Sequence, residues 1–376
     1  MEWSVPLADL DYGEAEEQAV LGVLRSKWLT MGAVTQEFEK AFSALCGAAY
    51  AISLSNATEA LHLACLALGV GPGDEVIVPS LSFVATANAV LYTGAEVVFA
   101  DIHSEADLTI SVADIERKIT PRTKAIIVMH YAGYPCRMPE LLALAQQHHL
   151  ALIEDVAHAP GASLEGRALG TWGDVGCFSF FSNKNLATGE GGMLVTQRED
   201  LAQKFLYYRS HGMTTLTYDR HKGHAYSYDV VALGYNYRID EIRAALGLAQ
   251  LAKLPGNNQR RRLLTAQYHQ ALKELLGLPF AHHPGQPAYH ILPVLLPRGV
   301  ERKPFQDHLR DCKIQTSIHY PPIHRFSYYQ NRYGRNDSLP LTEAVAAREV
   351  TLPLYPGMTG EQLASVVGAV REFINQ

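Results

Sequence analysis

Short apolar runs alternate with segments of helical periodicity along the first part of the chain. The runs predict strands at residues 50–54, 75–79, 96–100, 125–129 and 150–154, and the segments between them predict helices at 58–68, 85–92, 112–118 and 139–148. Alternation of this kind predicts a mostly parallel sheet that is covered by helices on both faces. Because the strands are almost continuously hydrophobic, we expect both faces of the sheet to be buried.

The pattern changes after about residue 250, where a long polar helix is followed by shorter segments. These segments lie at 289–296, 303–311 and 314–319, and a last helix begins near Gly360. We interpret this part as a second, smaller α+β domain. The sequence Leu254-Pro255-Gly256 predicts the boundary, which gives a large α/β domain at 1–254 and a small domain at 255–376.

Composition indicates a globular protein and excludes several classes of partner. Of the 376 residues 48% are hydrophobic, but no stretch of about 18 residues is uninterrupted by polar ones, so we expect no membrane contact. The formal charge of -6 argues against nucleic acid as a partner. The acidic N-terminus shows no signal segment and the five cysteines lack CxxC spacing, so we expect a cytoplasmic protein with reduced thiols.

The stretch SFFSNKNLATGEGG at 179–192 contains Lys184, the residue most indicative of chemistry. It follows an aromatic run at 176–181, which predicts a buried strand, and precedes a glycine-rich turn with unusual backbone geometry. A lysine forms an imine with an aldehyde only when its amine is neutral, and burial favours the neutral amine. Lys184 is therefore a candidate Schiff-base lysine, although an ordinary loop lysine is the alternative.

Polar residues follow the predicted strands, at the sheet edge where α/β proteins bind ligands. Ser55-Asn56-Ala57-Thr58 has the composition of a helix N-cap. The free N–H groups of such a helix start can bind a phosphate, and the alternative is a capped helix without a ligand. Asp155 ends an apolar run and needs a partner, either the protonated ring nitrogen of pyridoxal 5'-phosphate (PLP) or a structural one. His158 would contact that cofactor or lie in the core, and Phe83 would stack on a flat heterocycle or belong to the core.

Together and in this order, these segments resemble the DegT/DnrJ/EryC1/StrS family of PLP-dependent aminotransferases, the nucleotide-sugar branch of the fold type I enzymes. The resemblance runs along nearly the whole chain. It is carried by KWLTMG at 27–32, SNATEALHLA at 55–64, GVGPGDEVIVPSLSFVATANAV at 69–90, EDVAHAPGA at 154–162, SFFSNKNLATGEGG at 179–192, GYNYRIDEIRAALGLAQL at 234–251 and HYPPIH at 319–324. Any one motif is weak evidence, whereas seven in order are strong.

The resemblance implies catalytic roles for three residues. Lys184 would form the Schiff base with PLP and move the proton between substrate and cofactor. Asp155 would pair with the pyridine nitrogen, and His158 would occupy the polar position beside the ring. Phe83 would be the aromatic residue that stacks on the ring.

The resemblance also implies a phosphate site and a sugar cleft. Ala57, Thr58 and Ser179 would bind the cofactor phosphate, although Ala57 stands where many members have glycine. Asn236 would reach the phosphate of a neighbouring subunit, so that a homodimer completes the active site. The remaining residues implied, which would shape the cleft for the sugar nucleotide, are Thr30, His319 and His324.

The implied reaction moves an amino group from an amino acid, usually glutamate, to the keto group of a nucleotide-linked keto-deoxysugar. Pyridoxamine 5'-phosphate would carry the nitrogen between two half-reactions, which gives ping-pong kinetics. The alternatives are a keto-cyclitol acceptor, as in aminoglycoside-type biosynthesis, and a non-catalytic PLP-binding regulatory protein. The set of Lys184, Asp155 and His158 argues against the regulator, and lysine at 184 argues against the dehydratases of the family, which carry histidine there.

Histidines suggest two further hypotheses. The chain has 16 of them, but the pairs His148-His149 and His282-His283 are adjacent and do not share a helix face, so we predict no metal site. The histidine-rich stretch from His211 to His224 is predicted to be a loop near the cleft that tunes the acceptor, or else an exposed connection.

Overall fold

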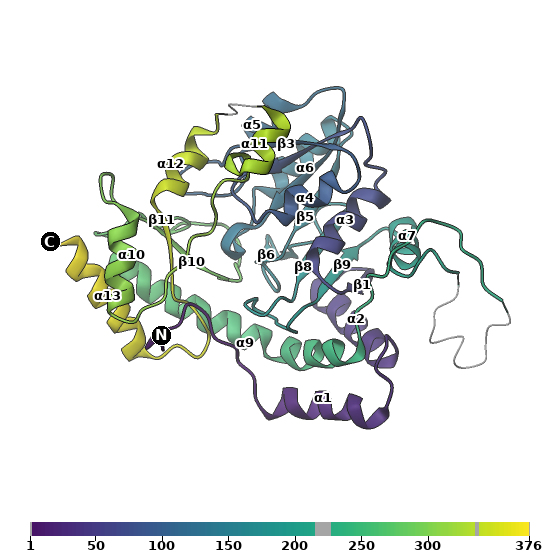
Figure 1. Cartoon of the computed structure of the whole chain (residues 1–376), viewed down its shortest axis with the longest axis horizontal. Helices are drawn as coiled ribbons and strands as arrows, with labels where there is room; N and C mark the ends of the chain where they lie inside the picture. Colours follow the sequence, from purple (N-terminus) through teal and green to yellow (C-terminus); the bar gives the residue numbers. More distant parts are fainter. Residues whose placement is uncertain (1, 215–226, 335–337, 376) are drawn as a thin grey trace.

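A seven-stranded sheet forms the centre of the larger part of the molecule (Figure 1). The computed structural model describes residues 2–214, 227–334 and 338–375. The strand order is β1-β9-β8-β5-β4-β2-β3. The bounds are β1 (Tyr50–Leu54), β2 (Glu75–Pro79), β3 (Glu96–Ala100), β4 (Thr123–Met129), β5 (Ala151–Asp155), β8 (Val175–Ser179) and β9 (Gly192–Thr196). Only β9 runs antiparallel to its neighbours β1 and β8, so the predicted mostly parallel sheet is confirmed.

Helices cover both faces of this sheet, as the alternating pattern predicts. Along β2, Val76 and Val78 pack into one hydrophobic cluster and Ile77 into another, because successive side chains of a strand point to opposite faces. The first cluster includes residues of α3 (Ala57–Ala67), α4 (Ala85–Leu91) and α7 (Glu199–Arg209). The second includes residues of α2 (Ala33–Cys46), α5 (Val112–Lys118), α6 (Met138–Gln147) and the start of α9 (Glu241–Leu272).

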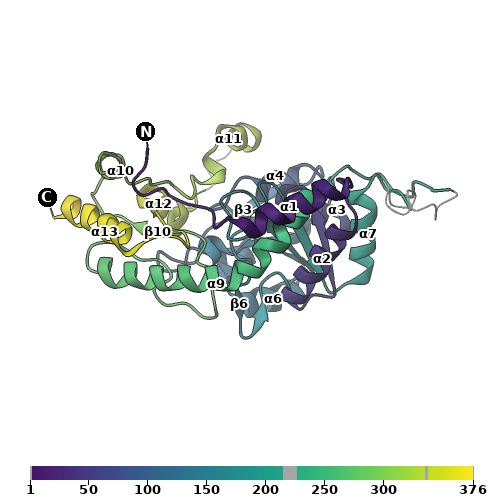
Figure 2. The same ribbon diagram turned by 90° about the horizontal axis from the view of Figure 1, so that it is seen from below.

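Helix α9 connects the two parts of the molecule. It is 32 residues long and continues through Pro255, and Figure 2 shows it running from α2 toward the C-terminal helices. Its first half contributes Leu254 to a cluster beneath the sheet, and its second half contributes Tyr268 to the C-terminal core. The proposed division at residues 254 and 255 therefore falls inside a continuous helix.

The C-terminal part is a small α+β unit, and its core also includes residues of the larger part, such as Met129 and Tyr131. Strand β10 (Leu292–Leu295) pairs antiparallel with β11 (Glu349–Leu352). The other elements there are α10 (Arg302–Asp311), η2 (Ile323–Arg325), α11 (Ser327–Tyr333), α12 (Pro340–Arg348) and α13 (Gly360–Ile374). Residues 314–319 form isolated bridges, one of them between Val5 and Ile314, so the N-terminal segment lies against this unit.

The remaining elements of the described chain are α1 (Glu14–Ser26), the 3-10 helix η1 (Tyr131–Gly133) and two short strands, β6 (Ser163–Leu164) and β7 (Arg167–Ala168), which form a hairpin. None of the helices in the described ranges combines the length and the apolar character that a membrane span requires. Most of the histidine-rich stretch 211–224 lies outside the described residues, which resume at 227.

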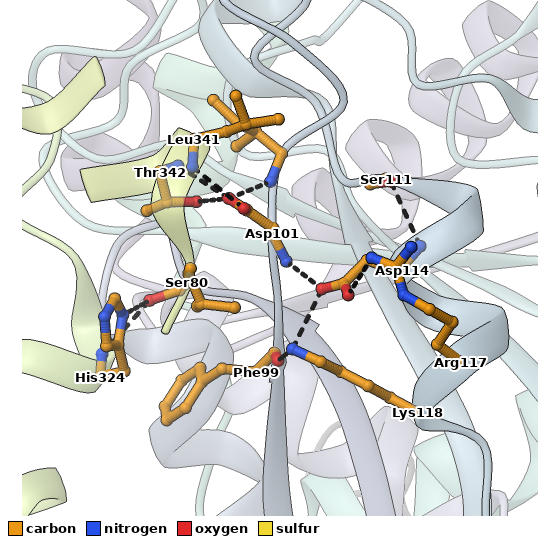
Figure 3. A network of polar contacts seen from close by, with 12 residues as sticks. Ser80, Phe99, Asp101, Ser111, Asp114, Arg117, Lys118, His324, Leu341 and Thr342 are labelled. Atoms are coloured by element: carbon orange, nitrogen blue, oxygen red, sulfur yellow. Dashed lines mark hydrogen bonds and ion pairs between the residues drawn. The ribbon is translucent and has the colours of Figure 1, made fainter. Parts of the chain in front are cut away.

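Polar contacts fasten helix α12 to the sheet (Figure 3). The carboxylate of Asp101, which follows β3, accepts the backbone N–H of Leu341 at 3.1 Å and of Thr342 at 2.7 Å. It also accepts the hydroxyl of Thr342 at 2.6 Å. Because these N–H groups lie in the first turn of α12, where no intrahelical acceptor exists, Asp101 satisfies them and fixes the helix on the sheet.

Candidate active site

A cavity of about 700 Å³ lies at the carboxyl ends of the central strands. It gathers residues that are distant in sequence because parallel strands end at one edge of the sheet. Eight of the predicted site residues line it: Ala57, Thr58, Phe83, Asp155, His158, Ser179, Lys184 and His319.

The start of helix α3 forms one wall of the cavity. The side chain of Asn56 caps the helix by accepting the N–H of Glu59 at 2.9 Å. This leaves the N–H groups of Ala57 and Thr58 without an intrahelical acceptor, at the positive end of the helix dipole. Both residues line the cavity together with Ser179, the last residue of β8. The arrangement suits a phosphate group.

Gly192 allows strand β9 to pack closely against the start of helix α3. It pairs with Leu54 on β1 and with Ser179 on β8, so it lies between the helix start and the end of β8. A Cβ atom there would lie 2.5 Å from the carbonyl atoms of Asn56 and 2.9 Å from the nitrogen of Ala57. Of the predicted turn glycines only Gly189 has a positive φ, of 84°. Gly192 is thus required for space rather than for backbone geometry.

Lys184 projects into the cavity from the turn after β8 and is partly exposed there. Its backbone N–H donates to the carbonyl of Phe181 at 2.9 Å, which fixes the turn. Burial lowers the pKa of its amine from 10.5 to about 8, and the nearby carboxyl of Asp155 opposes part of this change. A substantial fraction of the amine is therefore neutral near physiological pH, as a nucleophilic lysine requires.

Asp155 lies at the end of β5 and is 4% exposed. Oδ2 accepts the hydroxyl of Thr86 at 2.8 Å, and Oδ1 accepts the N–H of Ala157 at 3.1 Å. Burial raises the pKa of this carboxyl, whereas these two hydrogen bonds and the charge of Lys184 lower it. A buried carboxylate held in this way needs a cationic partner, and a protonated ring nitrogen in the cavity would supply one.

His158 is buried and held in one tautomer. Nδ1 accepts the N–H of Ala132 at 3.3 Å, so the neutral ring carries its hydrogen on Nε2 and donates it to the hydroxyl of Tyr320 at 2.9 Å. The ring of His290 lies against it at a centroid distance of 4.3 Å. Burial, with Lys184 and His319 nearby, lowers the pKa of His158 well below its usual value, so the ring is neutral.

Phe83 lies in the loop between β2 and α4 and is 55% exposed, although it is a large apolar residue. Its ring borders the cavity and lies 6.0 Å from the ring of Tyr320. An exposed aromatic face on a cavity wall is available to stack on a flat ligand. Phe83 is therefore not the core residue that its sequence context also allowed.

Three predicted site residues do not line this cavity in the described chain. Thr30 and Asn236 are both exposed. Thr30 forms an isolated β-bridge with Asp240, and Asn236 forms one with Ser210. His324 is buried away from the cavity, where Nδ1 bonds to the hydroxyl of Ser80 at 2.7 Å (Figure 3).

The other ring nitrogen of His324 bonds to Glu343 of α12 at 3.0 Å. Both ring nitrogens of His324 thus have a partner within the protein and need no substrate to satisfy them. Its sequence motif placed it near a cleft, but the fold uses it to connect the C-terminal unit to the sheet.

Comparison with known proteins decides among the interpretations of this geometry. The sequence profile of the DegT/DnrJ/EryC1/StrS aminotransferase family matches residues 11–371. The chain belongs to this family. The spore coat polysaccharide biosynthesis protein SpsC of Bacillus subtilis is 40% identical over 99% of this chain and 96% of SpsC.

Solved structures of similar proteins agree with this assignment. DesV of S. venezuelae, solved in complex with a ketimine intermediate, has 35% identity and a TM-score of 0.92 over the full length of both chains. The aminotransferase PseC of Helicobacter pylori, which is involved in pseudoaminic acid biosynthesis, has 28% identity and a TM-score of 0.92, again over 100% of both chains. This member of the DegT/DnrJ/EryC1/StrS family is a PLP-dependent sugar aminotransferase of fold type I.

The cavity fits the family cofactor. It offers free N–H groups at a helix start for the phosphate and a buried carboxylate for the ring nitrogen. It also offers a lysine whose pKa is lowered to about 8, and an exposed aromatic ring for the cofactor ring to stack on. Among the described residues, no group of three or more His, Cys, Asp or Glu side chains is arranged to hold a metal ion.

Several residues that hold the site were not predicted from the sequence. Thr86 binds Asp155, and Tyr320 binds His158. Asn185, the neighbour of Lys184, accepts a hydrogen bond from Nδ1 of His290 at 2.9 Å and so positions the ring beside His158. Thr86, Tyr320 and Asn185 lie within the family motifs, whereas His290 does not. The motifs therefore indicated that these three residues lie near the site, but not which side chains they contact.

Proposed function

We propose that this enzyme transfers the amino group of glutamate to the keto group of a nucleotide-linked keto-deoxysugar by a ping-pong mechanism. Lys184, Asp155 and the start of α3 would hold PLP, which would supply the carrier of the nitrogen between the two half-reactions. The observation that carries the proposal is the lysine with a pKa of about 8 that faces a buried carboxylate across one cavity. The roles of the two relatives in polysaccharide and pseudoaminic acid biosynthesis support a sugar acceptor.

When bound, PLP supplies an aldehyde that takes up amino groups and a cationic ring that withdraws electrons from the reacting carbon. Lys184 would hold the cofactor and then, as a free neutral amine, move a proton at the reacting carbon. Asp155, whose charged form is stabilised by the hydrogen bonds from Thr86 and the N–H of Ala157, would pair with the ring nitrogen and favour its protonated form. His158 stays neutral and would orient the ring through its fixed Nε2–H and Tyr320.

The half-reaction with glutamate alone tests the ping-pong mechanism. We expect the enzyme without acceptor to release 2-oxoglutarate in an amount equal to its bound PLP and then stop, while the absorption of PLP converts to that of pyridoxamine 5'-phosphate. The converted enzyme would then be offered nucleotide-linked 3-keto and 4-keto sugars beside free keto-cyclitols. No 2-oxoglutarate without acceptor would refute the ping-pong mechanism, and turnover of cyclitols alone would replace the sugar acceptor.

We infer further that two chains form a homodimer in which Asn236 of one chain reaches the phosphate site of the other. Asn236 is exposed and does not line the cavity of its own chain. It follows a segment of exposed apolar side chains, of which Val231 is 53% exposed and Leu233 is 84% exposed. Apolar side chains that are gathered on a surface favour burial against a partner, which supports a second copy of this chain there.

Mixing two inactive variants tests the shared site. Asn236→Asp would place a negative charge beside the phosphate, and Lys184→Ala removes the essential amine. If Asn236 acts in the other subunit, the mixed dimer has one site with both natural residues, so activity should reappear after the variants are unfolded and refolded together. If Asn236 acts within its own chain, no site is intact and activity would stay absent.

A further inference from the structure

His319 is held from three sides by the small α+β unit and by η1. Its backbone N–H donates to Oε2 of Glu349 at 2.9 Å, and its carbonyl accepts the hydroxyl of Tyr131. Nδ1 of its ring lies 2.8 Å from Oγ1 of Thr351. The ring lines the cavity, and Nε2 makes no hydrogen bond to any residue that the structure describes. Whatever bonds to Nε2 is therefore supplied by the contents of the cavity.

The hydrogen-bond chain behind this ring has two possible directions. Oγ1 of Thr351 lies 2.5 Å from Oε1 of Glu349, and a hydroxyl has only one hydrogen to donate. When Glu349 is ionised, Thr351 donates to the carboxylate and accepts from Nδ1–H, so Nε2 of His319 presents a lone pair to the cavity. When Glu349 is protonated, its hydrogen lies on Oε1, because Oε2 already accepts the N–H of His319. Thr351 then donates to Nδ1, and Nε2 carries the hydrogen.

Both directions of the hydrogen-bond chain from Glu349 through Thr351 require a neutral His319 ring. Burial and the charge of the nearby Lys184 lower the pKa of His319 to about 4, so the ring is neutral over the working range of most enzymes. His319 and Lys184 line the same cavity. The change in direction of the chain is thus a change of tautomer and not of ring charge.

The surroundings of Glu349 set when it ionises. The side chain is on β11 and only 1% exposed. It is faced by the guanidinium of Arg302 on α10, by the hydroxyls of Tyr131 and Tyr320, and by its partners Thr351 and His319. Burial raises the pKa of Glu349 to about 8, and the hydrogen bonds and Arg302 oppose this only in part.

We propose that Glu349 and Thr351 are positioning residues that hold His319 in the tautomer whose Nε2–H donates to the carbonyl oxygen of the keto acceptor. A ketone oxygen only accepts hydrogen bonds, so it is bound by this tautomer and not by the other. Protonated Glu349 is the form that supports binding, and its ionisation turns the donor at Nε2 into an acceptor. The identity of the ketone rests on the function proposed above, whereas the tautomer of His319 does not.

The pH profile for the acceptor half-reaction is the first test. We expect kcat/KM for the keto acceptor to fall as pH rises through about 8, and Glu349→Gln to remove this fall. The amide of the glutamine can direct its NH2 at Thr351 at every pH and so keeps the donor tautomer. The neutral amine of Lys184 is favoured by the same rise in pH, so its titration acts in the opposite direction. A Glu349→Gln profile that still falls near pH 8 would overturn the proposal.

Variants of Thr351 test the middle of the chain. Thr351→Val keeps the shape but removes the hydroxyl, and we expect about a tenfold loss of kcat/KM for the ketone, with the rate of the glutamate half-reaction little changed. Thr351→Ser keeps a hydroxyl and should retain most of the wild-type kcat/KM for the ketone. Thr265→Val is the matched control, since Thr265 is 3% exposed and its hydroxyl has no partner within the described chain. Equal losses in Thr351→Val and Thr351→Ser would show that only packing matters.

Nitrogen NMR of histidine-labelled enzyme reports the tautomer without any turnover. The resonance of His319 is identified by its absence in His319→Gln. In the wild type we expect Nε2 to carry the hydrogen at about pH 7 and Nδ1 to carry it at about pH 9.5, and in Glu349→Gln we expect Nε2 to carry it at both. An unchanged tautomer across this range in the wild type would refute the chain. A normal tautomer change without any turnover of ketosugars would instead refute the proposed acceptor alone.

Discussion

Thr86 donates its hydroxyl hydrogen to Oδ2 of Asp155 across 2.8 Å, and it is itself 2.7 Å from the hydroxyl of Ser82. All three residues are buried. Burial raises the pKa of Asp155, and the hydrogen bond from Thr86 is the largest effect that lowers it. Thr86 therefore stabilises the charged form of Asp155 in a place where burial disfavours it.

We expect Thr86→Val to weaken the proposed pairing of Asp155 with the cofactor ring. One hydrogen bond to a charged group contributes about 1.5–3 kcal/mol, so kcat should fall by roughly 10- to 100-fold and the Kd for PLP should rise. Steady-state kinetics and a PLP titration measure both. Thr86→Ser keeps the hydroxyl and should stay within a few-fold of the wild type. A fully active valine variant would mean that the N–H of Ala157 is sufficient.

The lowered pKa of Lys184 gives a prediction for cofactor uptake by the apoenzyme. Only the neutral amine reacts with an aldehyde, so the rate of uptake should rise with pH and level off above about 8, the pKa that burial produces. An ordinary lysine, with a pKa of 10.5, would give a rate that still rises at pH 10. Stopped-flow absorbance of PLP mixed with apoenzyme measures the rate. Lys184→Ala is the control, because it should bind PLP without a bond that borohydride can trap.

The central sheet was largely predictable because its strands are short apolar runs between turns. The predicted bounds of β1, β2 and β3 match the observed ones. Strand β9 was missed, since its apolar run, Met193 to Val195, is brief and directly follows the glycines that predict a turn. Its place between β1 and β8 is decided by pairing with strands far away in the sequence, which local periodicity does not report.

The site was predictable where a motif names the residue, and not where a distant side chain completes it. Lys184, Asp155 and His158 come from sequence motifs and line one cavity. The contact of His158 with Tyr320 spans 162 residues, and only the folded chain reveals it. His324 shows the opposite case, because a residue in a functional motif is used to fasten α12.

Glu241 gives a prediction for stability alone. Its carboxylate is 3% exposed and accepts the N–H groups of Gly32, Val34 and Thr35 at 2.8, 2.9 and 2.8 Å. These groups begin helix α2, so a negative charge both satisfies them and opposes the positive end of the helix.

Glu241→Gln keeps the volume but replaces an acceptor oxygen by a donor. We expect the free energy of unfolding to fall by about 2–3 kcal/mol, measured by urea denaturation of the apoenzyme. Glu17→Gln, on the exposed face of α1, should change it by less than about 0.5 kcal/mol. A loss at Glu241 no larger than at Glu17 would contradict the capping role.

The contact of Gly192 with the start of α3 predicts a defect in cofactor binding. An alanine Cβ would lie 2.5 Å from the carbonyl atoms of Asn56 and 2.9 Å from the nitrogen of Ala57, so the helix start must move. In the proposed phosphate site Ala57 and Thr58 offer their N–H groups to the cofactor, so such a shift would misalign them. We expect Gly192→Ala to raise the Kd for PLP at least tenfold, measured by equilibrium titration.

Gly256→Ala is the matched control for Gly192→Ala. Gly256 lies inside helix α9, and a Cβ atom there would meet nothing within 4 Å. Alanine is favoured over glycine in a helix by about 1 kcal/mol, so this variant should be at least as stable as the wild type and bind PLP equally well. If Gly192→Ala keeps the wild-type Kd, the helix start has no part in holding the phosphate. If it loses affinity while its unfolding curve stays near that of the wild type, the close approach of β9 to α3 serves the cofactor and not the fold.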